Sequence, residues 1–103
     1  MDYTEPTNGI TQKSKEYVTQ YLPKIGTVQS VEIHWDKENI DYTTTITGTT
    51  GTINVTGFSI GYGGEGPHGL AWLLETLKVP VNAEKEIFAG LGEENVGSRK
   101  WEV

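Results

Sequence analysis

The feature that most constrains the fold is a run of alternating apolar and polar residues between positions 31 and 60, with no helical pattern inside it. Apolar residues at every second position are typical of a strand with one buried face. The alternation predicts two strands over residues 31–35 and 40–47 and a third that begins at Ile53. Because no helix separates these strands, they are predicted to pair as an antiparallel meander.

The third strand contains a break in this alternation. Ile53 and Val55 continue the pattern of the preceding strands. Phe58 and Ile60 fall on the opposite parity, and Gly57 lies between the two pairs. A β-bulge adds one residue to a strand and thereby restores a single inward face. We therefore expect a bulge at Gly57.

Segments with helical spacing lie on both sides of the predicted strands. Thr11 is predicted to cap the first helix, with Ile10 as an apolar staple before it. After the glycine-rich stretch, leucines three and four residues apart predict a second helix that covers the sheet. Asn82 is predicted to cap a shorter helix that ends at Phe88. The tail is expected either to dock through Trp101 or to form an edge strand.

The predicted order is an N-terminal helix, three strands, a glycine loop, a covering helix, a short C-terminal helix and a tail. This order defines an α+β fold with a three-stranded antiparallel meander sheet. A length of 103 residues fits one domain. We place that single α+β domain at residues 11–103. Residues 1–10 are mostly polar and contain the turn signal Asn8-Gly9, so they are interpreted as a flexible N-terminal arm.

Charge and composition narrow the range of partners. Fourteen acidic and eight basic residues give a formal net charge of −6, which argues against direct nucleic-acid binding through a basic surface. The same charge would steer the protein toward a basic partner protein. The sequence contains no cysteine, which excludes disulfides and thiolate chemistry and agrees with a cytoplasmic location. No apolar run reaches the length of a membrane helix, so no membrane partner is expected.

The most biased stretch is Gly61-Tyr62-Gly63-Gly64-Glu65-Gly66, which leads into Pro67, a residue suited to the first position of a helix. Glycines at a strand-to-helix junction expose N–H groups at the positive end of the helix dipole, which suits an anion. The spacing matches neither the P-loop nor the dinucleotide-binding fingerprint. We interpret the loop as a binding site, with a tight strand-to-helix connection as the alternative. The predicted ligand-binding residues are Tyr62, Gly63, Gly64, Glu65, Gly66, His68 and Trp72.

Four side chains in or beside the loop have specific expected roles. Tyr62 and Trp72 would stack on a planar ligand, and Trp72 is also a candidate anchor for a dimer interface. Glu65 and His68 lie three residues apart and would form an acid/base pair if the protein were an enzyme. Neither a nucleophile nor a set of metal ligands accompanies them, so the sequence predicts no catalytic residue, no metal and no cofactor.

These features predict, first, a non-enzymatic small binding protein that sequesters an anionic or nucleotide-like molecule. Phage anti-defence proteins are an example of this type of role. The alternative is an acidic protein inhibitor, immunity protein or adaptor that blocks a basic surface of a partner protein. A small enzyme that uses Glu65 and His68 is the third hypothesis. An exposed sheet edge and a spare tryptophan also predict a homo-oligomer.

Overall fold

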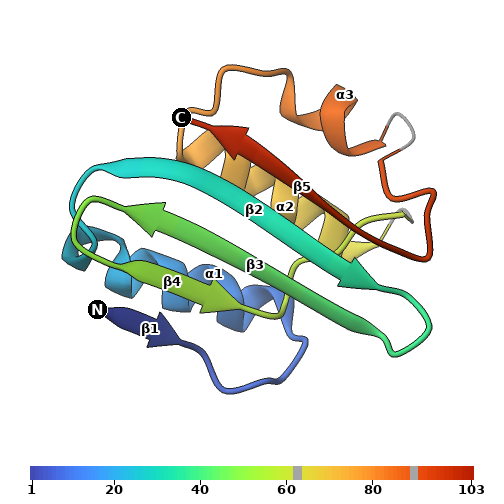
Figure 1. Ribbon diagram of the computed structural model, residues 1–103, viewed down its shortest axis with the longest axis horizontal. Helices are drawn as coiled ribbons and strands as arrows, with labels where there is room; N and C mark the ends of the chain where they lie inside the picture. The colour runs from blue at the N-terminus through green and yellow to red at the C-terminus, as the bar shows by residue number, and fades with distance from the viewer. Residues whose placement is uncertain (62–63, 89–90) are drawn as a thin grey trace.

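The computed structural model describes residues 1–61, 64–88 and 91–103. Its centre is a mixed sheet of five strands in the order β1-β4-β3-β2-β5 (Figure 1). The α+β class is therefore confirmed. The elements along the chain are β1 (Asp2–Thr4), α1 (Thr11–Tyr21), the 3-10 helix η1 (Leu22–Lys24), β2 (Val28–Asp36), β3 (Asp41–Gly48), β4 (Thr52–Val55), α2 (Glu65–Thr76), α3 (Ala83–Phe88) and β5 (Val96–Glu102).

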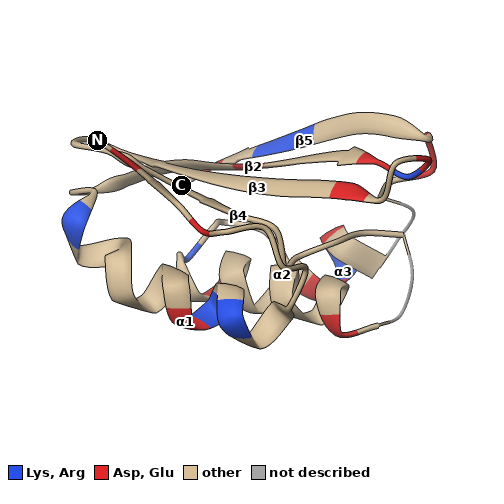
Figure 2. Ribbon diagram, turned by 90° about the horizontal axis from the view of Figure 1, so that it is seen from below, with Lys and Arg blue, Asp and Glu red and all other residues tan. Residues whose placement is uncertain are grey.

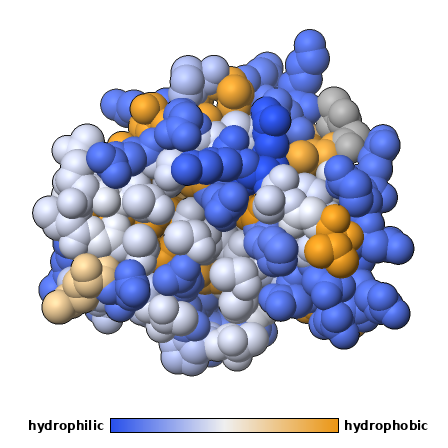
Figure 3. Space-filling view, in the orientation of Figure 1, coloured by the Kyte–Doolittle hydropathy of each residue, from blue (hydrophilic) through white to orange (hydrophobic). Residues whose placement is uncertain are grey.

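The helices cover one face of the sheet and leave the other face open (Figure 2). Val31, Ile33 and Trp35 are buried on the covered face of β2, where they join the core that includes the leucines of α2. On the open face, Glu32 and His34 of β2 lie opposite threonines of β3. Figure 3 shows this face as hydrophilic or weakly polar over most of its area, with scattered apolar residues. Threonine suits such a face because it combines strand propensity with a polar hydroxyl.

The three central strands pair as predicted. β2 and β3 are antiparallel, with Ile33 opposite Thr44. β3 and β4 are also antiparallel, with Ile46 opposite Ile53. The predicted sheet of three strands is nevertheless too small, because each edge receives one further strand. The meander is thus the centre of the sheet and not the whole of it.

The two added strands come from the ends of the chain. β5 pairs antiparallel with β2, which confirms the edge-strand alternative for the tail, and Trp101 is buried on its covered side. β1 pairs parallel with β4, and the next residue, Glu5, donates its N–H to the carbonyl oxygen of Asn54 at 2.9 Å. Asp2–Thr4 therefore form a strand within the segment that is predicted to be flexible. The flexibility of residues 1–10 stays a prediction.

The predicted bulge at Gly57 is wrong. β4 ends at Val55, and the chain then leaves the sheet. Phe58 and Ile60 are fully buried although they belong to no strand. Side chains alternate between the two faces only within a strand, so Phe58 and Ile60, which follow its end, need not keep the parity of Ile53 and Val55.

Two of the three predicted helix starts differ from the structure. Thr11 is the first residue of α1 and does not cap it; its hydroxyl donates to the carbonyl oxygen of Gly57 at 2.7 Å. Pro67 is the third residue of α2, and it remains in the first turn, where its missing N–H breaks no helical hydrogen bond. The cap at Asn82 is confirmed, because its side-chain oxygen accepts the N–H of Lys85 at 3.0 Å.

Candidate functional site

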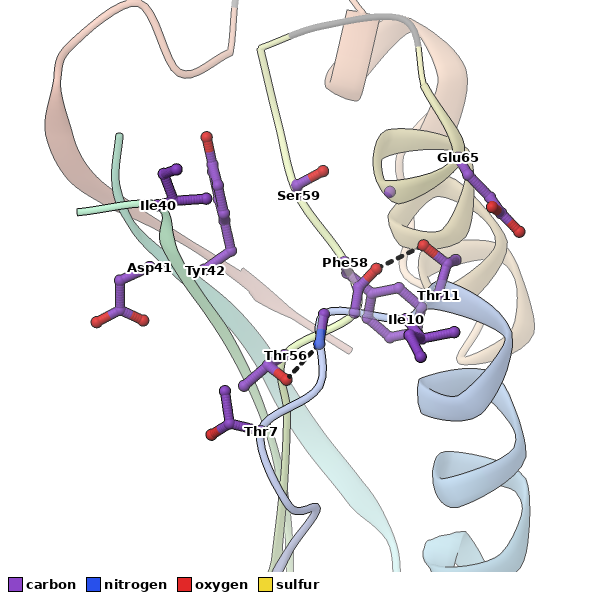
Figure 4. Close-up of a pocket in the computed structure, with 13 residues that line it drawn as sticks. Thr7, Ile10, Thr11, Ile40, Asp41, Tyr42, Thr56, Phe58, Ser59 and Glu65 are labelled. Carbon is purple, nitrogen blue, oxygen red and sulfur yellow. Dashed lines mark hydrogen bonds between the residues drawn. The ribbon is translucent and has the colours of Figure 1, made fainter. Parts of the chain in front are cut away.

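A cleft of about 420 Å³ opens where the first turns of α1 and α2 face the end of the sheet. Its walls come from four segments: the loop before α1, the start of β3 with the turn before it, the chain after β4, and the start of α2 (Figure 4). These segments are far apart in the sequence. The cleft is therefore a product of the tertiary structure.

Apolar and hydroxyl-bearing side chains dominate the lining. Ile40 and Tyr42 stand on one side, and Ile10 and Phe58 lie across from them (Figure 4). The hydroxyl groups of the lining belong to Thr7, Thr11, Tyr42, Thr56 and Ser59. The cleft thus offers apolar surface together with neutral hydrogen-bonding groups.

A buried hydrogen-bond network around Gly57 fixes one wall. The N–H of Gly57 donates to Oγ of Ser14 at 2.9 Å, and the Ser14 hydroxyl donates to the carboxylate of Glu5 at 2.6 Å. The hydroxyl of Thr11 binds the carbonyl oxygen of the same glycine. A Cβ at position 57 would lie 2.5 Å from the carbonyl oxygen of Ile10 and equally close to Ser14, so only glycine fits. The network joins the N-terminal segment, α1 and the chain after β4.

The opposite wall begins at an exposed turn formed by residues 37–40. Ile40 has a φ of 51°, which is rare for a β-branched residue, and 80% of its surface is exposed. The side-chain amide of Asn39 donates to the Asp36 carboxylate at 2.7 Å, and the Asn39 backbone N–H donates to it at 3.3 Å. In that order, these two hydrogen bonds lower the pKa of Asp36. Hydrogen bonds within the turn, rather than burial of Ile40, therefore fix the conformation around Asn39.

Part of the predicted glycine-loop site reaches the cleft. Tyr62 and Gly63 lie outside the described residues. Gly64 precedes the first residue of α2 with a φ of −104°, a value that does not require glycine. Gly66 lines the cleft, and a Cβ there would collide with the side chain of Ser59. Gly66 therefore allows close packing of α2 against the chain after β4, whereas Gly61 is required by its φ of 89°.

The structure separates the other predicted site residues. Glu65 lines the cleft. The ring of His68 packs against Phe88, with 4.9 Å between the ring centroids. Trp72 lies in a different groove, between α1 and α2, where Nζ of Lys15 is 5.4 Å from the ring centroid. Glu65 and Gly66 are thus the predicted residues that the described structure places at the cleft.

Sequence analysis missed the walls that Ile10, residues 40–42 and residues 56–59 provide. For one wall, the available signal was the shift of the apolar positions after Gly57, which we interpreted as a bulge. An isoleucine among the polar residues of the turn after β2 was the signal for the other. Neither signal reveals that the two walls face each other, because that depends on strand pairing and helix packing.

No family model, curated protein or solved structure matches this chain. In the described parts of the chain, no helix is long and apolar enough to cross a membrane. Across residues 1–61, 64–88 and 91–103, no three His, Cys, Asp or Glu side chains are grouped in a way that could hold a metal ion. Function is therefore inferred from the chemistry of the cleft.

Proposed function

We propose that this protein binds a small molecule without catalysis and holds it in the cleft between the β2–β3 turn and the first turns of α1 and α2. The cleft itself carries the proposal. Its volume of about 420 Å³ lies within the range of roughly 300–1,000 Å³ that is usual for small-molecule sites. Such sites combine apolar walls with a few polar groups, as Ile10 and Tyr42 do here with the hydroxyl of Thr56.

The kinds of side chain at the cleft favour binding over catalysis. Acid–base catalysis needs a titratable group within hydrogen-bond reach of the substrate, whereas hydroxyls and apolar groups orient and cover a ligand. The ring of His68 packs against Phe88, and the Glu65 carboxylate points away from Tyr42 in Figure 4. Sequestration of a nucleotide-like molecule, with its ring between the apolar walls, suits this arrangement.

Acidic residues at one end of the sheet favour a second candidate function, the blocking of a basic surface on a partner protein. The loop before β5 lies on the β2–β3 turn, because the N–H of Lys37 donates to the carbonyl oxygen of Asn95 at 2.8 Å. This contact gathers the acidic residues Asp36, Glu38, Asp41, Glu93 and Glu94 at that end (Figure 2). Binding through them would weaken as added salt screens the charges, whereas binding of an uncharged ligand in the cleft would change little.

The edge strand β5 supports the proposal of a homo-oligomer. The carbonyl oxygen of Asn95 accepts the N–H of Lys37, and the N–H of Val103 donates to the carbonyl oxygen of Gln29. Because backbone direction alternates along a strand, the odd-numbered residues of β5 direct their N–H and C=O groups toward β2. The N–H and C=O groups of even-numbered residues consequently face away from the sheet, where a second copy could pair with them. Light scattering that gives the mass of a single 11.4 kDa chain at micromolar concentration would contradict this.

NMR titration and thermal melts test the binding function. Nucleotides, nucleosides and other small heterocycles are added to ¹⁵N-labelled protein. We expect shifts in the backbone amides of Ile10, Gly57 and Gly66, and a higher Tm, because a ligand at 100 times its Kd stabilises by about 2.7 kcal/mol. Tyr42→Ala should lose binding, whereas Trp72→Ala should keep it, because Trp72 lies in the other groove.

Two outcomes would contradict the proposal. A panel that shifts none of the cleft amides would leave the cleft without a ligand of these classes. Loss of binding in Trp72→Ala with retention in Tyr42→Ala would move the site to the groove between α1 and α2. Both variants are first checked for a native amide spectrum, so that unfolding is not mistaken for loss of binding.

A further inference from the structure

Ile40 combines two properties that the stability of a turn does not require. Its φ of 51° lies in the left-handed region, where a β-branched side chain is strained. Its side chain is 80% exposed, so it buries little apolar surface that would offset the strain. Asparagine and glycine adopt this conformation at lower cost and are common in turns. Strained residues concentrate at functional sites, and ligand clamps are among them.

The position of Ile40 indicates what its side chain contacts. It lies beside Tyr42 at the side of the cleft that faces Ile10 and Phe58 (Figure 4). Ile10 is also partly exposed, at 46% of its surface, whereas Phe58 is fully buried. A flat ring between the two sides would cover both isoleucines and contact the aromatic face of Tyr42. Apolar residues that the fold leaves exposed would then be buried by the ligand.

The charges around the cleft disfavour an anion inside it. Among the described lining residues, Asp41 and Glu65 are charged, both are acidic, and both carboxylates point away from Ser59 (Figure 4). Glu65 also lies in the first turn of α2, where it offsets the positive end of the helix dipole, and Pro67 contributes no N–H there. Among these described lining residues, a phosphate would lose its water without gaining a cationic partner. The neutral hydroxyls of the lining can instead bond the edge of an uncharged ring.

We infer that the cleft binds an uncharged planar heterocycle of the nucleobase class, clamped between Ile40 with Tyr42 on one side and Ile10 on the other, and that Ile40 keeps its strained backbone conformation for this contact. The inference rests on the proposed function, because it assigns a ligand class to the same cleft. Any phosphate attached to the ligand lies outside. The ring determines affinity, and Ile40 acts as a specificity-determining residue.

Lys78 provides a matched control. Among the residues that the structure describes, it is the other non-glycine residue with positive φ, at 59°, and it follows the C-terminal end of α2. That end lies about 18 Å along the helix from the cleft, at 1.5 Å per residue. Ile40→Asn and Lys78→Asn should both relieve backbone strain and raise the Tm. Only Ile40→Asn removes an apolar wall of the cleft.

The experiment is isothermal titration of the full chain with the four common ribonucleosides, their 5′-monophosphates and inorganic phosphate. At least one nucleoside should bind, its monophosphate should bind no more tightly, and inorganic phosphate should not compete. Ile40→Asn should weaken nucleoside binding about tenfold, the loss expected for one large apolar contact. Lys78→Asn should bind like the unaltered protein.

Three results would overturn the inference, each in a recognisable way. A monophosphate that binds tenfold more tightly than its nucleoside, with competition by phosphate, would show an anion site. Unchanged binding by Ile40→Asn would remove the role of Ile40. Cleft amides that shift with other ligand classes but with no nucleoside would reject the ligand class while the proposed binding function stands, whereas a cleft that responds to nothing would reject both.

Discussion

The two sides of the cleft are held by different physical means. On the side of α1, Glu5, Ser14 and Gly57 share hydrogen bonds and are all buried. On the side of the β2–β3 turn, Ile40 is exposed and strained, and Asn39 holds the turn by bonds to Asp36. The comparison shows that stability accounts for the residues of the first wall, because substitution there would leave buried groups unpaired. The sequence of the other wall is not explained by stability.

The largest expected effect is that of Ser14→Ala, because it removes the link between two buried groups. The Gly57 N–H and the Glu5 carboxylate would both lose a partner, at a combined cost of roughly 3 kcal/mol in the free energy of unfolding. Urea unfolding at neutral pH measures this. Thr19→Ala on the exposed side of the same helix should change the stability by less than about 0.5 kcal/mol. Equal stability of the two variants would mean that the network does not fix this wall.

Gly57→Ala should have the next largest effect. The added Cβ would lie 2.5 Å from the Ile10 carbonyl oxygen and from Oγ of Ser14, and relief of such crowding costs about 2 kcal/mol. The double variant with Ser14→Ala sharpens the test. Because the two changes disturb the same contacts, their combined loss should be smaller than the sum of the single losses. Strict additivity would contradict the shared network.

Ile40→Asn should change stability in the opposite direction, with a gain of about 1 kcal/mol from the relief of left-handed strain. Ile40→Val is the matched control, since valine keeps the β-branch and should show no gain. Urea unfolding without ligand measures the free energy of unfolding of the two variants. A loss of stability in Ile40→Asn would show that Ile40 supports the fold, and the contrast between the two walls would disappear.

The smallest effect concerns Asp36, whose pKa lies below its ordinary value of 3.8 because of the two hydrogen bonds from Asn39. A lowered pKa in the folded state adds stability above the unfolded pKa, and that stability is lost as the pH falls through the folded value. Asn39→Ala removes the side-chain bond, so the pKa should rise toward 3.8 and the acid dependence should shrink.

NMR titration of the Asp36 carboxyl carbon measures this pKa. Glu38→Ala is the control, because it changes the same turn but keeps the backbone N–H of residue 38, which also lowers the pKa of Asp36. The pKa should therefore stay low in this variant. A similar rise in both variants would assign the shift to the turn as a whole rather than to Asn39.

The central strands and the helices were predictable because their signals are local. Side chains alternate along β2 and β3, and Asn82 caps α3 by a bond to a residue three positions away. Both patterns depend on backbone geometry over a few residues. The glycine-rich stretch likewise predicted a junction between sheet and helix, and α2 does begin within it.

The outer strands could not be predicted by the same rules. β1 has three residues, too few for a period to be recognised. In β5, Arg99 lies on the covered side, where an apolar residue is expected, because its guanidinium pairs with Glu86 at 2.5 Å. Trp101 donates its indole N–H to the same carboxylate at 3.0 Å. A residue of α3, more than ten positions away, thus supplies the reason for the polar pattern of β5.

The sequence by itself determined the fold class, the central meander and the cap of α3 at Asn82, because geometry over a few residues fixes these. Only the tertiary structure decided that Ile40, Gly57 and Gly66 line one cleft. Their proximity follows from strand pairing across a turn, a hydrogen-bond network with α1 and the packing of α2 on Ser59. Contacts between distant segments leave no period in the sequence, so a site assembled from four of them is visible only after folding.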